Sequence, residues 1–304
     1  MKRLKIYGLI FLVLALLISC EDPLPVELVQ ETSSQEYDVD VITPQPDAAV
    51  FTGYDSTGIT SPVPVNRSVI SLSGIKNTYK NITVSKGYAQ AIFYDTTKPV
   101  FSRNNVLIGF KTLEFGRVKF DNDTARVVPH RLFYRENGVI KDTLLGVKHI
   151  LVYRKRILPF RSNFPYDSSV KFHFDFFGQK PFLQTIKTPV EITAKLKLEG
   201  SRKNNDLRVE LSWNKAPKGD IIVIIGGLLE GRNEIIPLIR LKSIKTDKII
   251  IRNSLLQKIP FNKFDALIFT VVRHFSQSVS TIRLGDIFIS SQSIHNIRVD
   301  TPKN

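Results

Sequence analysis

Beyond Asp47, apolar and polar residues alternate with a period of two, which is typical of β-strands that are buried on one face. Between residues 171 and 176, three phenylalanines share one face of a predicted strand, while Lys171, His173 and Asp175 share the other. Gly, Asn, Asp and Pro separate such runs, as turns between strands require. Six further strands are predicted in this half of the chain: 69–72, 89–94, 106–110, 117–120, 131–134 and 149–153.

The second half opens with the most regular alternation of the chain, over residues 191–199, where every second residue is apolar. The pattern repeats over 207–213. Residues 221–225 form an unbroken apolar run, which predicts a strand buried on both faces. No window of 11 residues carries a sustained helical stripe, although residues 254–258 fit a single helical turn. Further strands are predicted at 235–241, 248–252, 267–273 and 286–290.

The N-terminus has a different pattern. Lys2, Arg3 and Lys5 precede an apolar run over residues 6–18. This run is too short to span a bilayer, which needs about 20 residues. A basic start followed by a short apolar run is typical of a cleavable secretion signal, which we assign to residues 1–19.

The apolar run ends in Leu17-Ile18-Ser19-Cys20, which resembles the lipobox of bacterial lipoproteins. The resemblance implies cleavage before Cys20, followed by lipidation of that cysteine with a diacylglyceryl group and an amide-linked chain such as palmitate. The mature protein is then expected in the cell envelope, anchored to the outer rather than the inner membrane. The alternative is an ordinary signal peptide, which leaves the lone thiol of a secreted chain unexplained.

Charge is distributed unevenly along the chain. Removal of residues 1–19 leaves 40 basic and 28 acidic side chains. Residues 21–60 hold nine of the acids and no Lys or Arg, so the remainder, 61–304, carries 40 bases against 19 acids. We interpret residues 20–47 as a proline-punctuated acidic tether joined to a basic body. Glu21 and Asp22 fit either a membrane-sorting signal or a solvated linker.

Composition changes near Pro189. All nine tyrosines lie at or before Tyr166, whereas isoleucine dominates afterwards. We therefore predict an all-β fold with two β-sandwich domains, residues 48–188 and 189–304, behind the signal peptide and the flexible tether. A body of this kind has no second long apolar segment, so its contact with the membrane is expected through the lipid alone.

Residues 207–217, with Trp213 ahead of Pro217, resemble the second strand of fibronectin type III-like domains. Leu255 and Leu256 before a later strand are similar to the leucine that plugs such sandwiches. The resemblance implies an immunoglobulin-like sandwich for residues 189–304. This part contains no tyrosine and therefore lacks the tyrosine corner that is common in these folds, and the resemblance carries no function.

Motifs for catalysis, cofactors and metals are absent from the sequence. No Gly-x-Ser-x-Gly elbow occurs, and the glycines of 226–231 lack the spacing of a phosphate-binding loop, so a β-turn explains them better. His173 and Asp175 share a strand face and could hold a cation with a third group, but a solvated polar stripe is the favoured interpretation. The five histidines are far apart in the sequence: His130, His149, His173, His274 and His295.

The segment 153–166 interleaves basic and aromatic residues. Its candidate contacts for an anionic ligand are Arg154, Lys155, Arg156 and Arg161, because arginine forks beside aromatic rings suit anionic sugars or phosphates. The alternative is a strand end and loop whose charges are merely solvated. Nucleic acid is a poor candidate partner, since the lipid anchor places the body outside the cytoplasm.

Three classes of function remain compatible with these patterns. The favoured one is a lipid-anchored binding or assembly module, with anionic envelope glycans as the candidate ligand. The second is a structural anchor or subunit of a surface or fimbrial complex, with other envelope proteins as partners. The third is an envelope hydrolase without a recognisable motif.

The lipobox generates the first testable prediction. Substitution Cys20→Ser should abolish lipidation and release or mislocalise the protein, because the thioether cannot form on a hydroxyl. Mass spectrometry of the mature N-terminus measures the modification directly. An unmodified Cys20 in the native protein, or a mature chain that starts elsewhere, would contradict the assignment.

Overall fold

The computed structural model describes residues 37–41, 50–51, 67–113, 116–136, 139–153, 163–176, 180–229, 231, 235–243, 247–282 and 284–301. They form strands almost throughout, and the predicted all-β class is confirmed. The predicted signal peptide and Cys20 lie outside these residues. In the described part of the chain, no helix is long and apolar enough to cross a membrane.

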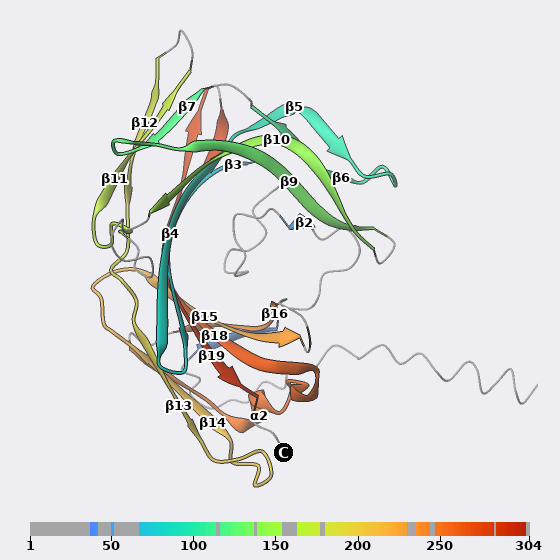
Figure 1. Ribbon diagram of the computed structural model, residues 1–304, viewed down its shortest axis with the longest axis vertical. Coiled ribbons are helices and arrows are strands. Elements are labelled where there is room, and N and C mark those ends of the chain that lie inside the picture. The colour runs from blue at the N-terminus through green and yellow to red at the C-terminus, as the bar shows by residue number, and fades with distance from the viewer. Residues whose placement is uncertain are drawn as a thin grey trace, which may run out of the picture. The chain divides into compact units, whose positions relative to one another are not determined.

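A ten-stranded sheet forms the centre of the fold and curls strongly along its width (Figure 1). Neighbouring strands are antiparallel except for β19 and β3, which pair in parallel over 12 residues. From one edge to the other, the order is β1 (Tyr37–Val41), β16 (Ile235–Ser243), β15 (Asp220–Leu229), β18 (Phe264–Thr281), β19 (Gly285–Asp300), β3 (Ser68–Tyr79), β4 (Ile82–Ile92), β10 (Val139–Tyr153), β9 (Arg126–Glu136) and β2 (Val50–Phe51).

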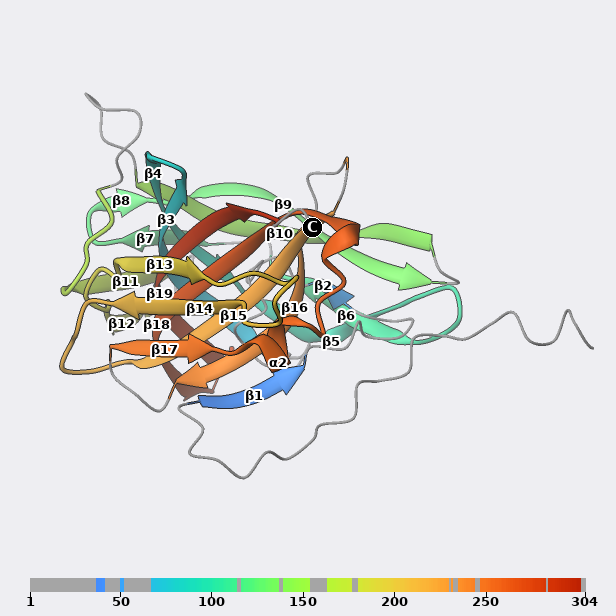
Figure 2. The same ribbon diagram turned by 90° about the horizontal axis from the view of Figure 1, so that it is seen from below.

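Two smaller sheets pack on one face of this sheet, which we call the outer face. One consists of β12 (Phe182–Lys187), β11 (Ser169–Asp175), β7 (Arg117–Phe120) and β8 (Asp123–Thr124). The other consists of β13 (Ala194–Glu199), β14 (Arg208–Trp213) and β17 (Lys248–Ile251). Figure 2 shows β13, β14 and β17 side by side across the central strands.

The opposite face is called the inner face. At its β9 end, the hairpin of β5 (Tyr94–Phe101) and β6 (Leu107–Thr112) packs against β9 and β10. Among the described residues, the helical elements are α2 (Asn253–Leu256) and the 3-10 turn η1 (Phe261–Lys263), both between β17 and β18. The α2 turn coincides with the predicted helical turn.

The N-terminal core, the first of two apolar clusters on the outer face, depends on the predicted phenylalanine stripe. Phe172, Phe174 and Phe176 are all buried, and the ring of Phe174 stacks on that of Phe93 with centroids 4.2 Å apart. Ile70 of β3 is among the residues that meet them from the central sheet. The alternation at 171–176 therefore predicted correctly which side chains enter the core.

The C-terminal core lies between β13, β14 and β17 on one side and β15, β16 and β18 on the other. Trp213 is 5% exposed and belongs to it. The run 221–225 is buried on both faces, as predicted: Ile221, Val223 and Ile225 join this core, while the two isoleucines between them point to the inner face.

Pro189 lies in the connection between β12 and β13. Every member of the C-terminal core follows Pro189, but Ile287 and Ile289 of β19 belong to the N-terminal core. Residues 35–304 form one compact unit. Independent folding of residues 189–304 stays a prediction, and it requires β19 to remain ordered without its parallel partner β3.

Two local features differ from the sequence-based interpretation. Within the stretch interpreted as a tether, Tyr37–Val41 forms β1 and pairs with the β16 edge. Gly226 and Gly227 belong to β15 rather than to a turn. The reason at Gly227 is packing, because a Cβ atom there would lie 2.4 Å from the ring of Phe264.

The C-terminal core generates a stability prediction. Trp213→Ala should lower the free energy of unfolding by about 3–5 kcal/mol, because a large buried ring is replaced by a cavity. Leu198→Ala in the neighbouring strand is the control: Leu198 is 39% exposed, so its loss should be under about 1 kcal/mol. Urea unfolding followed by circular dichroism measures both, and equal losses would contradict the assigned core.

Candidate functional site

The outer face of β19 changes from apolar to polar and back to apolar along the strand. Ile287 and Ile289 belong to the N-terminal core, and Ile297 and Val299 pack against the C-terminal core. The residues between them face the gap between the two cores. With their neighbours they form what we call the polar seam: Arg273 on β18, Ser291, Ser293 and His295 on β19, and Lys76 and Thr78 on β3.

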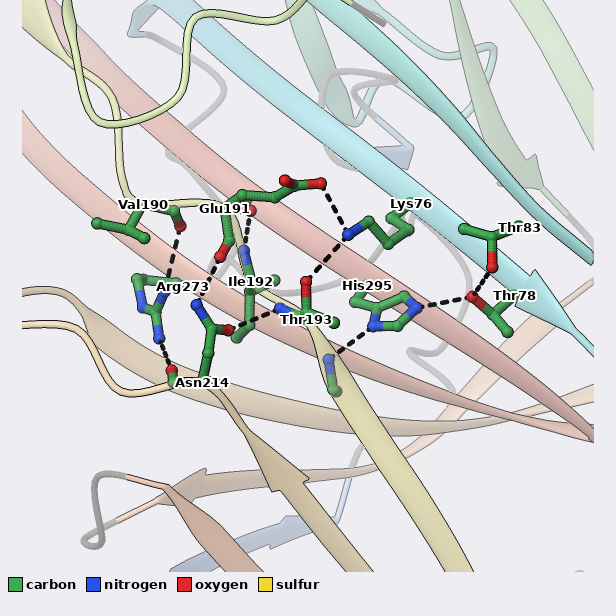
Figure 3. A network of polar contacts seen from close by, with 12 residues as sticks. Lys76, Thr78, Thr83, Val190, Glu191, Ile192, Thr193, Asn214, Arg273 and His295 are labelled. Carbon is green, nitrogen blue, oxygen red and sulfur yellow. Dashed lines mark hydrogen bonds and ion pairs between the residues drawn. The ribbon is translucent and has the colours of Figure 1, made fainter. Parts of the chain in front are cut away.

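The seam binds the connector, residues 188–193, which joins β12 to β13 (Figure 3). The backbone N–H of Ile192 donates to Ser293 Oγ at 2.8 Å, and that of Ala194 donates to His295 Nδ1 at 2.8 Å. Buried backbone groups outside a sheet need such partners. The connector is not part of a sheet, so the polar side chains of β19 accept hydrogen bonds from its backbone instead.

Charged side chains add a second set of contacts. Lys76 Nζ lies 2.8 Å from Glu191 Oε1 and donates to Thr193 Oγ1 at 3.0 Å. Asn214 accepts from the Thr193 N–H and donates to the Glu191 carbonyl, at 2.7 and 2.9 Å. The connector is thus fixed from β3 on one side and from the end of β14 on the other.

Arg273 is the most unusual member of the seam. It is 1% exposed, and its guanidinium donates to the carbonyls of Val190 and Asn214 at 3.2 and 2.5 Å. Among the described residues, no carboxylate forms an ion pair with it. Desolvation lowers the pKa of Arg273. A buried cation balanced only by carbonyl dipoles leaves a positive potential around it.

Gly219 makes room for this side chain. Its φ of +112° lies in a region that favours glycine, and a Cβ atom there would lie 2.7 Å from Arg273 Cγ. The same turn carries Pro217 and Lys218. The turn therefore packs against the aliphatic part of the Arg273 side chain.

A pocket of about 260 Å³ lies at the start of the connector. Clefts for small ligands are typically about 300–1,000 Å³, so this one suits a small group such as a single sugar ring. The loop that forms one side is fixed by backbone bonds: the Asp167 N–H donates to the Pro189 carbonyl and the Thr188 N–H to that of Ser168. The lining residues are Asp167, Ser168, Ser169, Lys187, Thr188, Val190, Pro217, Lys218 and Phe275.

The lining combines charge, hydroxyls and one aromatic ring. Lys187 and Lys218 supply two exposed ammonium groups, and Ser168 and Ser169 supply exposed hydroxyls. Phe275 lies two residues after Arg273 on the same face of β18, so the buried cation is close to the pocket floor. This set of groups can bind an anionic group that is attached to a ring with both hydroxyls and an apolar face.

His295 is held neutral by its contacts. Nδ1 accepts from the Ala194 N–H, so the ring proton lies on Nε2 and donates to Thr78 Oγ1 at 2.8 Å. Desolvation, and to a lesser degree the charge of Lys76, lowers the pKa of His295 to about 4. Burial, with a smaller contribution from Lys148, has the same effect on His130, whose pKa is also about 4.

The structure brings none of the described residues that were predicted from the sequence into this pocket. Cys20 and the candidate anion contacts Arg154, Lys155, Arg156 and Arg161 are outside the described residues. His173 Nε2 lies 3.3 Å from Asp175 Oδ1, but in the described part of the chain no three His, Cys, Asp or Glu gather to hold a metal ion.

Sequence reasoning missed the pocket and the seam. The available signal was Arg273 itself, which continues the outward apolar series of Leu267, Phe269 and Val271. A charged residue in such a series marks the end of a core or a polar site. Lys187 and Lys218 carry no local signal, because only the tertiary structure brings them together.

Comparison of this chain with models of known protein families finds no match, and comparison with curated protein sequences finds none either. The pocket offers two lysines, one aspartate, hydroxyls and a phenylalanine ring to a ligand.

The tautomer of His295 generates a prediction for stability against pH. The folded state favours neutral His295, whose pKa is about 4 there. The stabilisation from the neutral ring is complete above pH 6.5 and is lost as the pH falls from 6.5 toward 4. The penalty at pH 5 should be about 2 kcal/mol relative to pH 7. His295→Asn keeps an acceptor for Ala194 and does not titrate, so it should lose about 2 kcal/mol less over this range.

Urea unfolding at pH 7 and pH 5 measures the effect. His173→Asn is the control, because the His173 side chain is one-third exposed and lies outside the seam. An equal loss of stability in the native protein and in His295→Asn would show that His295 does not carry the acid sensitivity.

Proposed function

We propose that this protein is a lipid-anchored envelope protein that binds anionic glycans through the pocket at the start of the connector. The observation that carries the proposal is the pair of exposed lysines, Lys187 and Lys218, that line this pocket together with serine hydroxyls and Phe275. An anionic group in the pocket would pair with these two ammonium groups. Residues 61–304 contain more basic than acidic side chains, which also favours an anionic ligand.

The lipobox at Cys20 supports attachment to the outer membrane of a bacterial envelope. Only 16 residues separate Cys20 from β1. In a coil, this length averages about 23 Å. The anchor then holds the β16 edge near the headgroups, and the body can contact polymers of the same surface.

The C-terminal sandwich is proposed to be immunoglobulin-like. Support comes from the three-stranded sheet of β13, β14 and β17 packed over β16, β15 and β18, with Trp213 in the core between them. This relation concerns architecture and adds nothing to the choice of ligand.

A structural role in an envelope complex is the second candidate. The observation in its favour is the tip of the β5–β6 hairpin, where Phe101, Val106 and Leu107 are 50, 44 and 44% exposed. Apolar residues gathered at an exposed tip are typical of a protein contact. Stable co-purification of other envelope proteins, lost in Phe101→Ser, would favour this role.

Titration of the soluble Cys20→Ser protein against alginate and against neutral dextran tests glycan binding. Alginate should bind and dextran should not, and the affinity should fall steeply with added salt because exposed charges are screened beyond about 8 Å at 0.15 M. Lys187→Gln with Lys218→Gln should weaken alginate binding roughly tenfold, which is about 1.4 kcal/mol. The control pair Lys203→Gln and Lys258→Gln removes the same charge from exposed turns and should change affinity less than threefold.

The outcomes separate the alternatives. Equal effects of both lysine pairs would show that net charge binds and that the pocket does not. A larger effect of replacing Arg154, Lys155, Arg156 and Arg161 by glutamine would place the contact on that segment instead. Salt-insensitive binding of dextran would indicate an aromatic sugar platform, and no binding of either polymer would favour the structural role.

A further inference from the structure

Two residues that line the pocket also begin the small sheet of β12, β11, β7 and β8 (Figure 1). Ser169 and Lys187 are the first pair in the ladder between β11 and β12. Both are exposed, whereas their neighbours Val170 and Ile186 point to the other side of the sheet and belong to the N-terminal core. The lining of the pocket therefore continues into the outward surface of this sheet.

Basic side chains follow one another along this outward surface. Lys171 comes two positions after Ser169 on β11, so it lies on the same face. Lys119 and Arg117 of β7 pair with the residues four and six positions after Ser169. A rise of about 3.4 Å per residue places the three cations at about 7, 14 and 20 Å along the sheet from Ser169.

The acids near these cations leave them unpaired in the described part of the chain. Asp175 Oδ1 lies 3.3 Å from His173 Nε2. Asp121, in the β7–β8 turn, accepts a hydrogen bond from the backbone N–H of Lys171 at 2.8 Å, and Asp123 lies on β8 at the edge of the sheet. Among the described residues, none of these acids forms an ion pair with a lysine or an arginine. The cations can therefore pair with an anion from outside the chain.

The same surface offers a hydroxyl and an apolar side chain beside the cations. Thr185 lies opposite Lys171 in the ladder, and Leu183, which is 64% exposed, lies opposite His173. A sugar ring has hydroxyls that exchange hydrogen bonds with a threonine and an apolar face that covers a leucine. The surface thus has the groups that a chain of acidic sugars needs.

Ionic screening decides which ligands can use these cations. Exposed charges that are separated by more than about 8 Å interact little at 0.15 M salt. By the spacing along the strands, Lys119 and Arg117 lie farther than this from the pocket, so they add little to the binding of one sugar ring there. They contribute when the ligand itself extends over them.

We propose that the pocket binds one unit of an acidic polysaccharide and that Lys171, Lys119 and Arg117 form a basic track for the units that follow. This inference rests on the proposed function and adds the class of ligand, which is an extended polyanion rather than a free sugar acid. Each contact on the track is weak because it is exposed to solvent. Linked contacts reinforce one another, so the affinity depends on how far the ligand extends.

Binding of two alginate oligosaccharides to the soluble Cys20→Ser protein tests the basic track. The disaccharide covers the pocket but does not reach β7, whereas the octasaccharide extends across the sheet. Arg117→Gln with Lys119→Gln should weaken octasaccharide binding roughly tenfold, because two charge contacts are lost. The same variant should change disaccharide binding less than about twofold, which also shows that it is folded.

Two further pairs serve as controls. Lys195→Gln with Lys248→Gln removes the same charge from the exposed face of the β13-β14-β17 sheet and should leave the binding of both oligosaccharides unchanged. Lys187→Gln with Lys218→Gln removes the cations of the pocket and should weaken both. Variants are compared for one oligosaccharide at a time, because an octasaccharide offers several units to the pocket and binds more tightly for that reason alone.

The results separate the basic track from the pocket. An equal loss of octasaccharide binding in the Lys195 and Lys248 pair would show that net charge binds the chain, and would overturn the track. An equal loss for both oligosaccharides in the Arg117 and Lys119 pair would overturn it too, as would unchanged octasaccharide binding, which leaves the proposed function in place. Failure of the protein to bind either oligosaccharide would overturn the track and the proposed function together.

Discussion

The parallel ladder between β19 and β3 is the interaction on which the rest of the fold depends. It joins β3, the first long strand of the sheet in the sequence, to β19, the last, over 12 paired residues. Without it the central sheet would divide into β1-β16-β15-β18-β19 and β3-β4-β10-β9-β2. Each half would retain one small sheet on its outer face, but the pairing makes a single sheet that two sandwiches share.

This shared sheet creates the polar seam. Two apolar cores on one face must end before they meet, because each is closed by its own small sheet. The connector, which crosses from one small sheet to the other, runs over the gap and needs hydrogen-bond partners outside any ladder. Ser293, His295 and Arg273 supply them, so the same residues that stabilise the connector also place a buried cation beside the pocket.

The charge of the chain has a corresponding arrangement in space. The body is basic, and the acidic N-terminal segment meets it first at β1, where aspartates lie opposite a lysine and an arginine. The pocket lies on the outer face, away from that ladder, where its lysines remain exposed.

The sequence by itself determined the strands and which of their faces are buried. Alternation at 171–176 and 207–213, and the apolar run at 221–225, depend only on local periodicity, and the structure confirms each of them. Even the burial of residues 221–225 on both faces followed from the absence of polar positions in the run.

Only the tertiary structure decided how the strands combine. Nothing local in β19 or β3 selects a parallel partner more than 200 residues away, because pairing depends on what each edge meets in space. The same holds for Lys187 and Lys218, which lie far apart in the chain and line one pocket. Periodicity fixes the face of a residue, and long-range packing fixes its neighbours.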